Sequence, residues 1–196
     1  MGLSPSVAAP QSVAEMLAQL AGPDVIGQDI PIQTFSTVYP SPNDFRDASR
    51  ALNAARDTDG EAAATEHRAK LRHDAREAIG LQMKAELSRA AQTSDGFRER
   101  LALFWGDHFT VRATNGVRRH LVSPYVEETI RPHVAGKFAD MLVAVVGNPM
   151  MILYLSQNQS IGPNSSNGLR HGRGLNENLA RELLELHTLG IGGKPN

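Results

Sequence analysis

The sequence of 196 residues predicts an all-α protein, a single domain of packed, non-parallel helices with long polar loops. Apolar residues recur at intervals of three and four from residue 12 to residue 190, which is the period of helices with one buried face. No alternation of strand and helix patterns is visible, and no segment repeats at a fixed interval. A chain of this length can bury one good core, so we expect residues 1–196 to form one helical domain.

The first two helices are marked by their capping residues. Ser12 and Glu15 have the spacing of a capping box, so a helix should begin there and end at Gly22-Pro23. A second helix should follow Ser41-Pro42, an N-cap residue followed by proline. Prolines interrupt residues 24–41, for which we expect a connection with at most one short strand.

Residues 61–92 predict a long helix rich in Ala, Glu, Lys and Arg. Its apolar stripe recurs every four residues at Leu71, Ala75, Ile79, Met83 and Leu87. We interpret the charged remainder of this helix as a solvated face, because mixed charges are typical of exposed helix surfaces.

A further helix should begin near Thr93-Ser94-Asp95 and present one apolar face. That face comprises Phe97, Leu101, Phe104, Trp105 and His108. A turn is expected at Thr114-Asn115-Gly116, and helices are expected over 123–134, 137–146, 149–156 and 176–189. Residues 157–174 are rich in Gly, Asn and Ser, and we predict a mobile polar loop there.

The composition excludes several classes of function. The net charge is −1 and the pI is about 6.7, so no overall basic field would attract nucleic acid. No apolar run is long enough to cross a membrane. Cysteine is absent, which excludes disulfides, thiol catalysis and cysteine-based metal sites. No signal peptide is visible in this chain, and the compartment is left open.

The stretch NENLARELLELHTLG, from Asn176 to Gly190, concentrates polar side chains beside a leucine stripe. Together with His108 it supplies the catalytic candidates Asn178, Arg181, Glu182, Glu185 and His187. The alternative is a well-capped helix with a charged face. In that case Asn176 is the N-cap, and Arg181 pairs with Glu177 and Glu185 at helical spacing.

The two histidines of this set have the most chemical potential. His108 and His187 each lie beside an apolar stripe near a predicted helix C-terminus. Either they only hydrogen-bond carbonyls in the core, or they transfer protons or bind a ligand between the two helices. We expect Leu183 and Leu186 to pack on Phe97, Leu101 and Phe104, which would bring Glu182 into contact with His108.

The spacing argues against a metal site on a single helix. A helical di-iron site uses Glu-x-x-His, whereas this chain has Glu185-x-His187, whose side chains point to nearly opposite sides. No H-E-x-x-H occurs. We name no metal ligands and no cofactor. A metal bound by His108 with Glu182 or Glu185, from separate helices, is the arrangement left open.

Two short basic clusters are candidates for anion contacts. The first comprises Arg112, Arg118, Arg119 and His120. The second, Arg170, His171 and Arg173, precedes the predicted helix N-terminus at Asn176, where backbone N–H groups could bind an anion. The alternative for this second cluster is a solvated loop.

Three segments resemble a known family. "LALFWGDHFTV" and "NENLARELLELHTLGIGG", joined by "GKFADMLVAVVGNPMMILYLSQNQS", resemble the large bacterial family catalogued as domain of unknown function 1800. The likeness runs from about Phe97 to Gly193, with a weaker one at "GLSPS". The resemblance implies a predominantly helical protein without an established activity. It also implies that this chain is a fragment or a shortened member of a larger protein.

The chain departs from the family pattern at two places. The family often has Trp-His-Asn-His-Phe where this chain has Trp105-Gly106-Asp107-His108-Phe109, and its Tyr-Leu-Asp reads Tyr154-Leu155-Ser156 here. If the family chemistry uses the lost His or Asp, this member is altered. Members are often encoded beside proteins resembling sulfatases, so the resemblance implies such a protein partner.

Two functions remain open at this point, and the sequence does not decide whether the protein is an enzyme. The first is a polar site between the helices that end near His108 and His187. The second is a non-catalytic scaffold or protein-interaction module. The sequence does not predict an oligomeric state.

Overall fold

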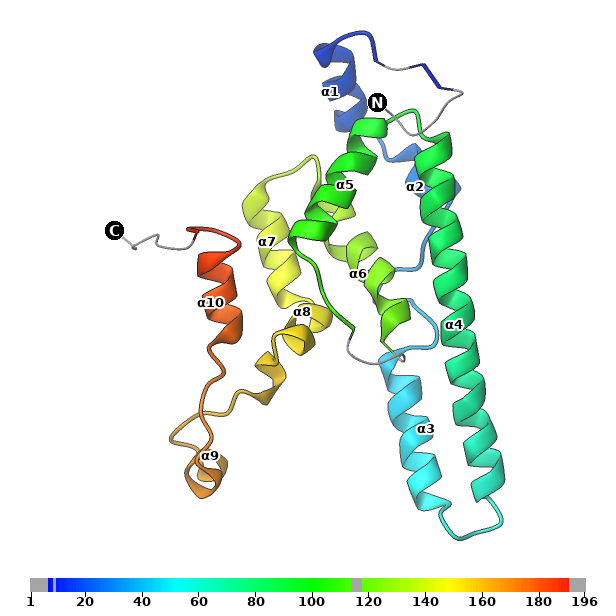
Figure 1. Ribbon diagram of the computed structural model, residues 1–196, viewed down its shortest axis with the longest axis vertical. Helices are drawn as coiled ribbons and strands as arrows, with labels where there is room; N and C mark the ends of the chain where they lie inside the picture. Colours follow the sequence, from blue (N-terminus) through cyan, green and yellow to red (C-terminus); the bar gives the residue numbers. More distant parts are fainter. Residues whose placement is uncertain (1–6, 9, 114–117, 191–196) are drawn as a thin grey trace.

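The computed structural model describes residues 7–8, 10–113 and 118–190, and every regular element in these ranges is helical (Figure 1). The α-helices are α1 Val13–Ala21, α2 Val25–Asp29, α3 Pro42–Ala54, α4 Glu61–Gln92, α5 Gly96–His108, α6 Val122–Thr129, α7 Phe138–Gly147, α8 Pro149–Tyr154, α9 Ser166–His171 and α10 Asn178–Glu185. Short 3-10 helices are η1 Arg119–Leu121, η2 Arg131–His133 and η3 Gln157–Gln159. The all-α prediction is confirmed. The predicted turn at 114–116, the GLSPS segment and Gly193 lie outside the described residues.

The helix starts follow the capping residues. Ser12 accepts a hydrogen bond from the backbone N of Glu15 at 3.1 Å. Ser41 and Asp44 form a reciprocal capping box. In the connection over residues 24–41, the described chain contains the short helix α2 and no strand. Asp24 caps α2 by accepting from the backbone N of Gly27.

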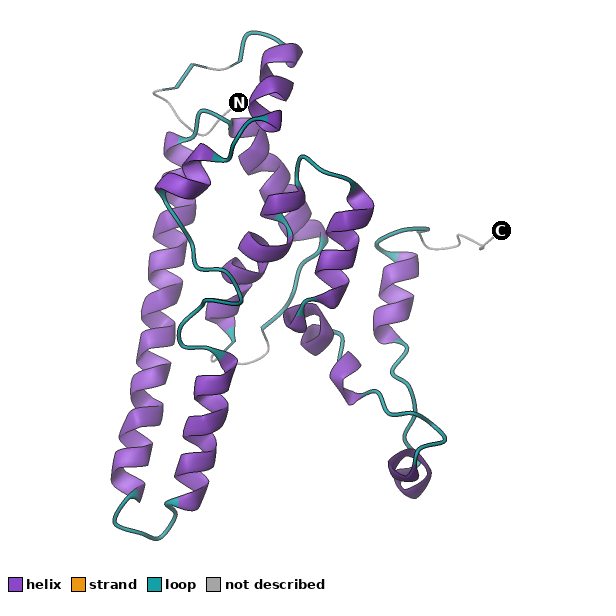
Figure 2. Cartoon of the chain, turned by 180° about the vertical axis from the view of Figure 1, so that it is seen from behind, coloured by secondary structure: helices purple, strands orange, loops and turns teal. Residues whose placement is uncertain are grey.

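Helices α3 and α4 form a long antiparallel hairpin along one side of the molecule (Figure 2). The first part of the predicted apolar stripe of α4 is buried, at Leu71 and Ala75. The prediction is wrong for Met83 and Leu87, which are 57% and 66% exposed. The cause is geometric, because residues four apart drift by about 40° around a helix at each step. The stripe therefore turns away from α3.

The hydrophobic core lies among α5, α6, α7 and α8. Its most deeply buried side chains are Phe109, Tyr125, Ile130, Met141, Val145 and Met151. The phenol of Tyr125 donates to the carbonyl of Phe109 at 2.9 Å, and burial raises the pKa of Tyr125. The face predicted for α5 is wrong in part. Arg98 and Ala102 are buried, while Phe104 is 58% exposed.

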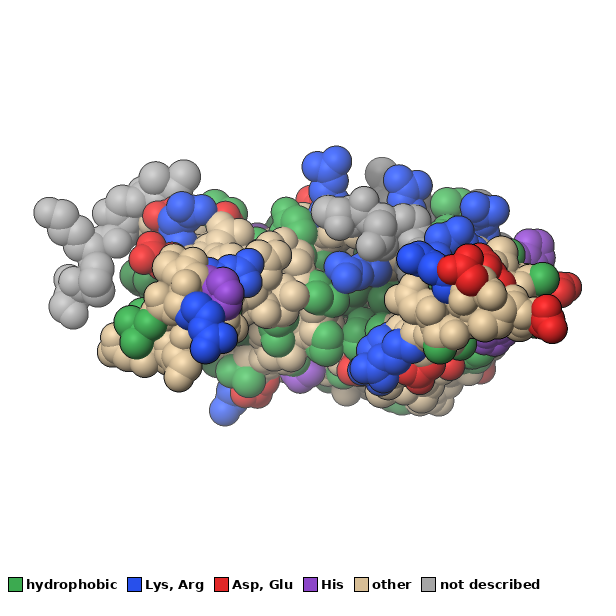
Figure 3. All heavy atoms as spheres, turned by 90° about the horizontal axis from the view of Figure 1, so that it is seen from below, with side chains coloured by type: hydrophobic (Ala, Val, Ile, Leu, Met, Phe, Trp, Pro, Cys, Tyr) green, Lys and Arg blue, Asp and Glu red, His purple; other side chains and the backbone are tan. Residues whose placement is uncertain are grey.

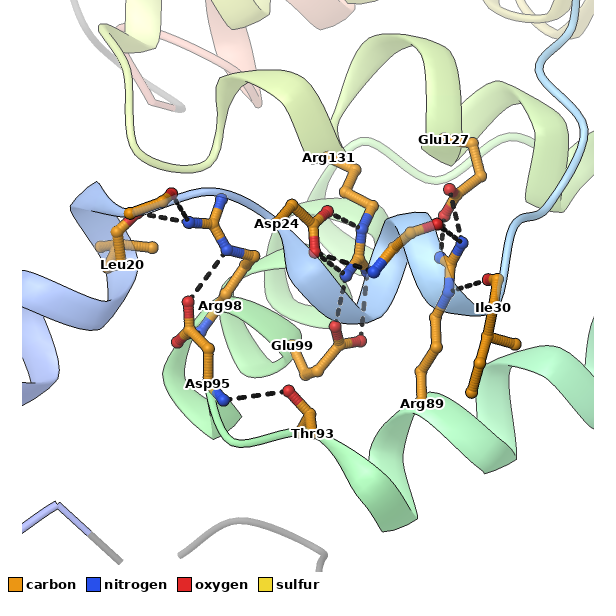
Figure 4. Close-up of polar contacts among 12 residues, drawn as sticks. Leu20, Asp24, Ile30, Arg89, Thr93, Asp95, Arg98, Glu99, Glu127 and Arg131 are labelled. Carbon is orange, nitrogen blue, oxygen red and sulfur yellow. Dashed lines mark hydrogen bonds and ion pairs between the residues drawn. The ribbon is translucent and has the colours of Figure 1, made fainter.

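Three buried arginines attach the N-terminal segment to the core (Figure 4). Arg131 binds two carboxylates. Its Nη2 donates to Asp24 at 2.8 Å, and its Nη1 to Glu99 at 3.2 Å. Arg98 donates to Asp95 and to the carbonyls of Leu20 and Gly22, whereas Arg89 donates to Glu127 and the carbonyl of Ile30. Residues 20–30 are thus held by guanidinium groups as much as by apolar packing.

The charges at Arg131 stabilise one another. Burial alone would raise the pKa of Asp24, but the hydrogen bond and charge of Arg131 outweigh it and hold that pKa below 3.8. Burial would lower the pKa of Arg131, and its bonds to Asp24 and Glu99 outweigh burial and raise it. Both groups are therefore charged at neutral pH, and each depends on the other.

The polar segment 157–174 contains η3 and α9 and is not wholly irregular. Ser165 caps α9 by accepting from the backbone N of Gly168, and Gly172 ends the helix in the left-handed region at φ 59°. The mobility of this segment stays a prediction. Helix α10 is shorter than the expected 176–189, because the backbone N atoms of His187 and Leu189 bond to carbonyls five residues earlier instead of four.

We predict that Arg131→Met lowers the free energy of unfolding by ~3–5 kcal/mol, because it leaves buried carboxylates without their cation. The folded-state pKa of Asp24 is depressed, so its contribution is present above pH 3.8 and is lost as pH falls through the folded pKa. In the variant the pH dependence of stability should reverse, because carboxylates buried without a cation have raised pKa values, and the free energy of unfolding should rise as pH falls. Urea unfolding at several pH values measures both effects. Arg50→Met, which breaks an exposed pair with Asp47, is the control and should change stability by less than about 0.5 kcal/mol.

Candidate functional site

The rings of His108 and His187 meet where α5 ends and the chain leaves α10. Their centroids lie 5.3 Å apart with planes inclined by 67°. Phe109 contacts both rings, at 4.7 Å from His108 and 4.9 Å from His187. Trp105 adds an edge-on contact to His108 at 5.5 Å. The site is therefore a pair of imidazoles against an aromatic wall.

Helix α10 presents its inner side at four-residue intervals. Leu179, Leu183 and His187 are half-buried on that side, and Leu179 packs against the hydrophobic core. The expected packing of Leu186 on α5 is wrong, because Leu186 is 54% exposed. The inner side follows i, i+4, i+8 spacing, which keeps His187 on the side of the two leucines with a rotation of about 40° at each step. The leucines thus set the position of the histidine.

Glu182 is half-buried in α10. Among the described residues no hydrogen bond or ion pair joins Glu182 to His108. The expected Glu182–His108 contact is therefore wrong, and the imidazole on which Glu182 acts is that of His187. The acidic side chain lies five residues before His187, which follows the end of α10, and it acts on that imidazole through charge. Glu185 is exposed at the end of α10.

The other polar candidates on α10 act locally. Arg181 is exposed and donates to Asn178 Oδ1 at 2.8 Å. The predicted pairs of Arg181 with Glu177 and Glu185 do not form, because that hydrogen bond holds the guanidinium near the start of the helix. Asn178 in turn donates its backbone N to Asn176 Oδ1 at 2.9 Å.

Asn176 connects the two ends of the polar segment. Its Nδ2 donates to the carbonyl of Ser156 at 3.1 Å, and its backbone N donates to Ser160 Oγ at 2.9 Å. Ser156 adopts the left-handed region at φ 58°, which turns the chain after α8. Asn176 therefore fixes where α10 begins.

The electrostatics of the pair favour a neutral His187. Burial lowers its pKa, and the charge of His108 lowers it further, while Glu182 opposes both. The Nδ1 atom of His187 is buried and has no hydrogen-bond partner among the described residues. Such an atom costs ~1–3 kcal/mol unless something satisfies it.

The basic clusters lie elsewhere. Arg170, His171 and Arg173 are exposed at the C-terminal end of α9 (Figure 3). Cations at this end of α9 are stabilised by the negative end of its helix dipole. Their position therefore does not support an anion site at the start of α10. In the other cluster His120 is fully buried, and its Nε2 lies 2.6 Å from the carbonyl of Pro40. Arg112 and Arg119 are exposed.

Within the described ranges, no three acidic or histidine side chains converge closely enough to hold a metal ion. Metal binding by His108 with Glu182 or Glu185 therefore gains no support from the donor set. Gly106, which replaces the first histidine of the family pattern, faces α6. A Cβ built there would lie 3.5 Å from Val126 Cγ2. The Cα–Cβ bond of a side chain at residue 106 would therefore point toward α6.

Phe138 is a residue that the sequence did not indicate. It lies at the start of α7 and contacts Trp105 and Phe109, with centroids 5.5 and 6.0 Å apart. Nothing in its local pattern separates it from an ordinary first-turn residue. The position of Phe109, directly after His108 in the tryptophan-containing motif, was the available signal for the wall.

Fold and site together define an all-helical protein with a histidine pair at the junction of two helices. The chain belongs to the family described as "Protein of unknown function (DUF1800)", whose profile matches residues 3–194. No curated protein and no solved structure matches the chain significantly. Of the helices in the described ranges, none has the length and apolarity that a bilayer crossing requires.

We predict that the pKa of His187, measured by NMR titration, lies below 6.5. His108→Gln should raise it without restoring 6.5, because burial is the larger cause. Glu182→Gln should lower it further. The stability due to neutral His187 is present above pH 6.5 and is lost as pH falls through the folded pKa.

The matched control is Glu177→Gln, at the opposite end of α10. It should leave the titration of His187 unchanged. A rise in the pKa of His187 on Glu182→Gln would show that this carboxylate does not act on the pair.

Proposed function

We propose that the chain carries a proton-transfer site in which neutral His187 accepts a proton from a bound ligand or water. The observation behind the proposal is the contact between the two imidazole rings, with His187 Nδ1 buried and lacking a partner. A lowered pKa keeps His187 unprotonated at neutral pH, as a general base requires.

The two histidines have different roles in this proposal. His108 is exposed and lies at the surface end of the pair, while His187 is half-buried. Burial lowers the pKa of His187, the charge of His108 lowers it further, and the carboxylate of Glu182 stabilises the imidazolium formed after proton uptake. Phe109 and Trp105 hold the rings in place. Asn178, Arg181 and Glu185 have no direct part, because no hydrogen bond or ion pair joins any of them to either described ring.

A partner resembling sulfatases also belongs to the proposal, on the strength of the family association alone. A partner of this kind would bring an esterified substrate to the histidine pair. Co-expression of the chain with a sulfatase-like protein encoded beside a family member, followed by affinity capture, tests the association. Failure to co-purify would remove the partner without touching the site.

The activity can be tested with 4-nitrophenyl acetate, phosphate and sulfate as model substrates. We expect turnover of at least one ester, with a rate that rises with pH through the pKa of His187. His187→Gln should reduce the rate by about 10²–10⁴-fold, the usual contribution of a general base. His108→Gln should shift the inflection to higher pH, because it raises the pKa of His187.

His171→Gln, at an exposed histidine of α9, is the control and should behave as wild type. Circular dichroism establishes that each variant is folded. Equal rates for the wild type and His187→Gln would overturn the proposal, and so would the absence of turnover with all three ester classes.

One observation favours a protein-interaction module instead. Leu184, Leu186 and Leu189, from α10 and the turn after it, are each about half exposed. If α10 is an interface, Leu184→Ser and Leu186→Ser should abolish capture of the sulfatase-like protein. Under the proton-transfer proposal the same variants keep the pH-dependent rate.

A further inference from the structure

Helices α4, α5 and α6 border a groove whose lining contains neither histidine of the pair. Its volume is about 450 Å³. Buried ion pairs, Arg89 with Glu127 and Arg131 with Glu99, form part of its lining. These arginines also hold the N-terminal segment, so the groove is built on a fixed base.

The walls of the groove are apolar side chains that remain exposed to solvent. Met83 and Leu87 come from α4 and Leu103 from α5, with exposed fractions of 57%, 66% and 61%. These side chains include the end of the α4 stripe, beyond the reach of α3. An adjoining hollow shares Met83 and Leu87 and continues along α4 to Gln92, with Lys84 in its lining. The apolar surface is therefore elongated along the helix axis.

The groove carries a net negative charge. Four carboxylates line it, from Glu86, Glu99, Asp107 and Glu127, against the two guanidinium groups of Arg89 and Arg131. Glu99 and Glu127 are neutralised by those arginines. Glu86 and Asp107 are exposed, and within the described ranges neither forms an ion pair. A ligand that covers the apolar walls would meet uncompensated negative charge at the rim.

We infer that this groove binds a basic amphipathic helix of a partner protein, with leucine-like side chains between Met83, Leu87 and Leu103 and Lys or Arg beside Glu86 and Asp107. An elongated apolar track between helices suits a helix that inserts residues at i, i+3/i+4 and i+7. The acidic rim disfavours an anionic membrane surface, and it complements cations on the partner.

The inference can be tested with a fluorescein-labelled helical peptide of leucine and lysine in that pattern. We expect saturable binding by fluorescence anisotropy. Leu87→Ser or Leu103→Ser should weaken it by about tenfold, because each removes apolar contact area. The double variant Glu86→Gln/Asp107→Asn should weaken it at low salt and reduce its dependence on salt concentration.

Controls come from the same helices and residue types. Leu81→Ser alters a leucine of α4 that is 62% exposed but outside the groove, and Glu66→Gln alters an exposed carboxylate of α4. Both should bind the peptide as the wild type does. A peptide with glutamate in place of lysine should not bind.

Amide shift changes in the wild-type protein should map to α4, α5 and α6, which tests the site without any variant. The inference is overturned if the lysine peptide fails to bind, if the glutamate peptide binds equally, or if shift changes fall elsewhere. Preferential binding of anionic vesicles over the peptide would overturn it in favour of a lipid surface. Self-association through this groove, seen as a dimer that Leu87→Ser dissolves, would overturn it in favour of a second copy.

Discussion

The buried arginines are the constraint on which the rest of the structure depends. A guanidinium group without a carboxylate could not remain in this interior, and Arg131 is the cation to which both Asp24 and Glu99 are paired. The network joins α2, α5 and η2, which are far apart in the sequence. It therefore fixes the orientation of α5, and the orientation of α5 decides which neighbours His108 faces.

The same network explains how much could be predicted from the sequence. Most helices and their N-caps could be predicted, because the spacing of apolar residues and capping residues such as Ser41 are local signals in the sequence. The buried face of α5 was misread, because Arg98 occupies a position that polarity assigns to solvent. A buried arginine is recognisable only through partners contributed by other segments. The short helix α2 was missed for a related reason, since its cap Asp24 also serves a distant cation.

The candidate site was predicted in outline and not in its contacts. Each of the two histidines lies near a helix end and beside an apolar stripe, and this was enough to predict that they share one site. The structure places their rings in contact. The choice of Glu182 as the partner of His108 failed because side chains on one helix face follow four-residue steps. Those steps keep His187 on the side of Leu179 and Leu183 and do not include Glu182. No local pattern marked Phe138, because its contacts depend on how α7 packs against α5.

The attachment of α10 has a consequence for the energetics of local opening. None of its residues, all of which the structure describes, is fully buried, and its anchors are Leu179, the ring of His187 and the hydrogen bonds of Asn176. Separating this helix from the core exposes little apolar area, so it costs far less free energy than unfolding the chain. His187 accordingly lies in a weakly anchored part of the fold, which can open without unfolding the core. A ligand that bridges both rings would hold that part closed, and amide exchange along α10 would report its occupancy.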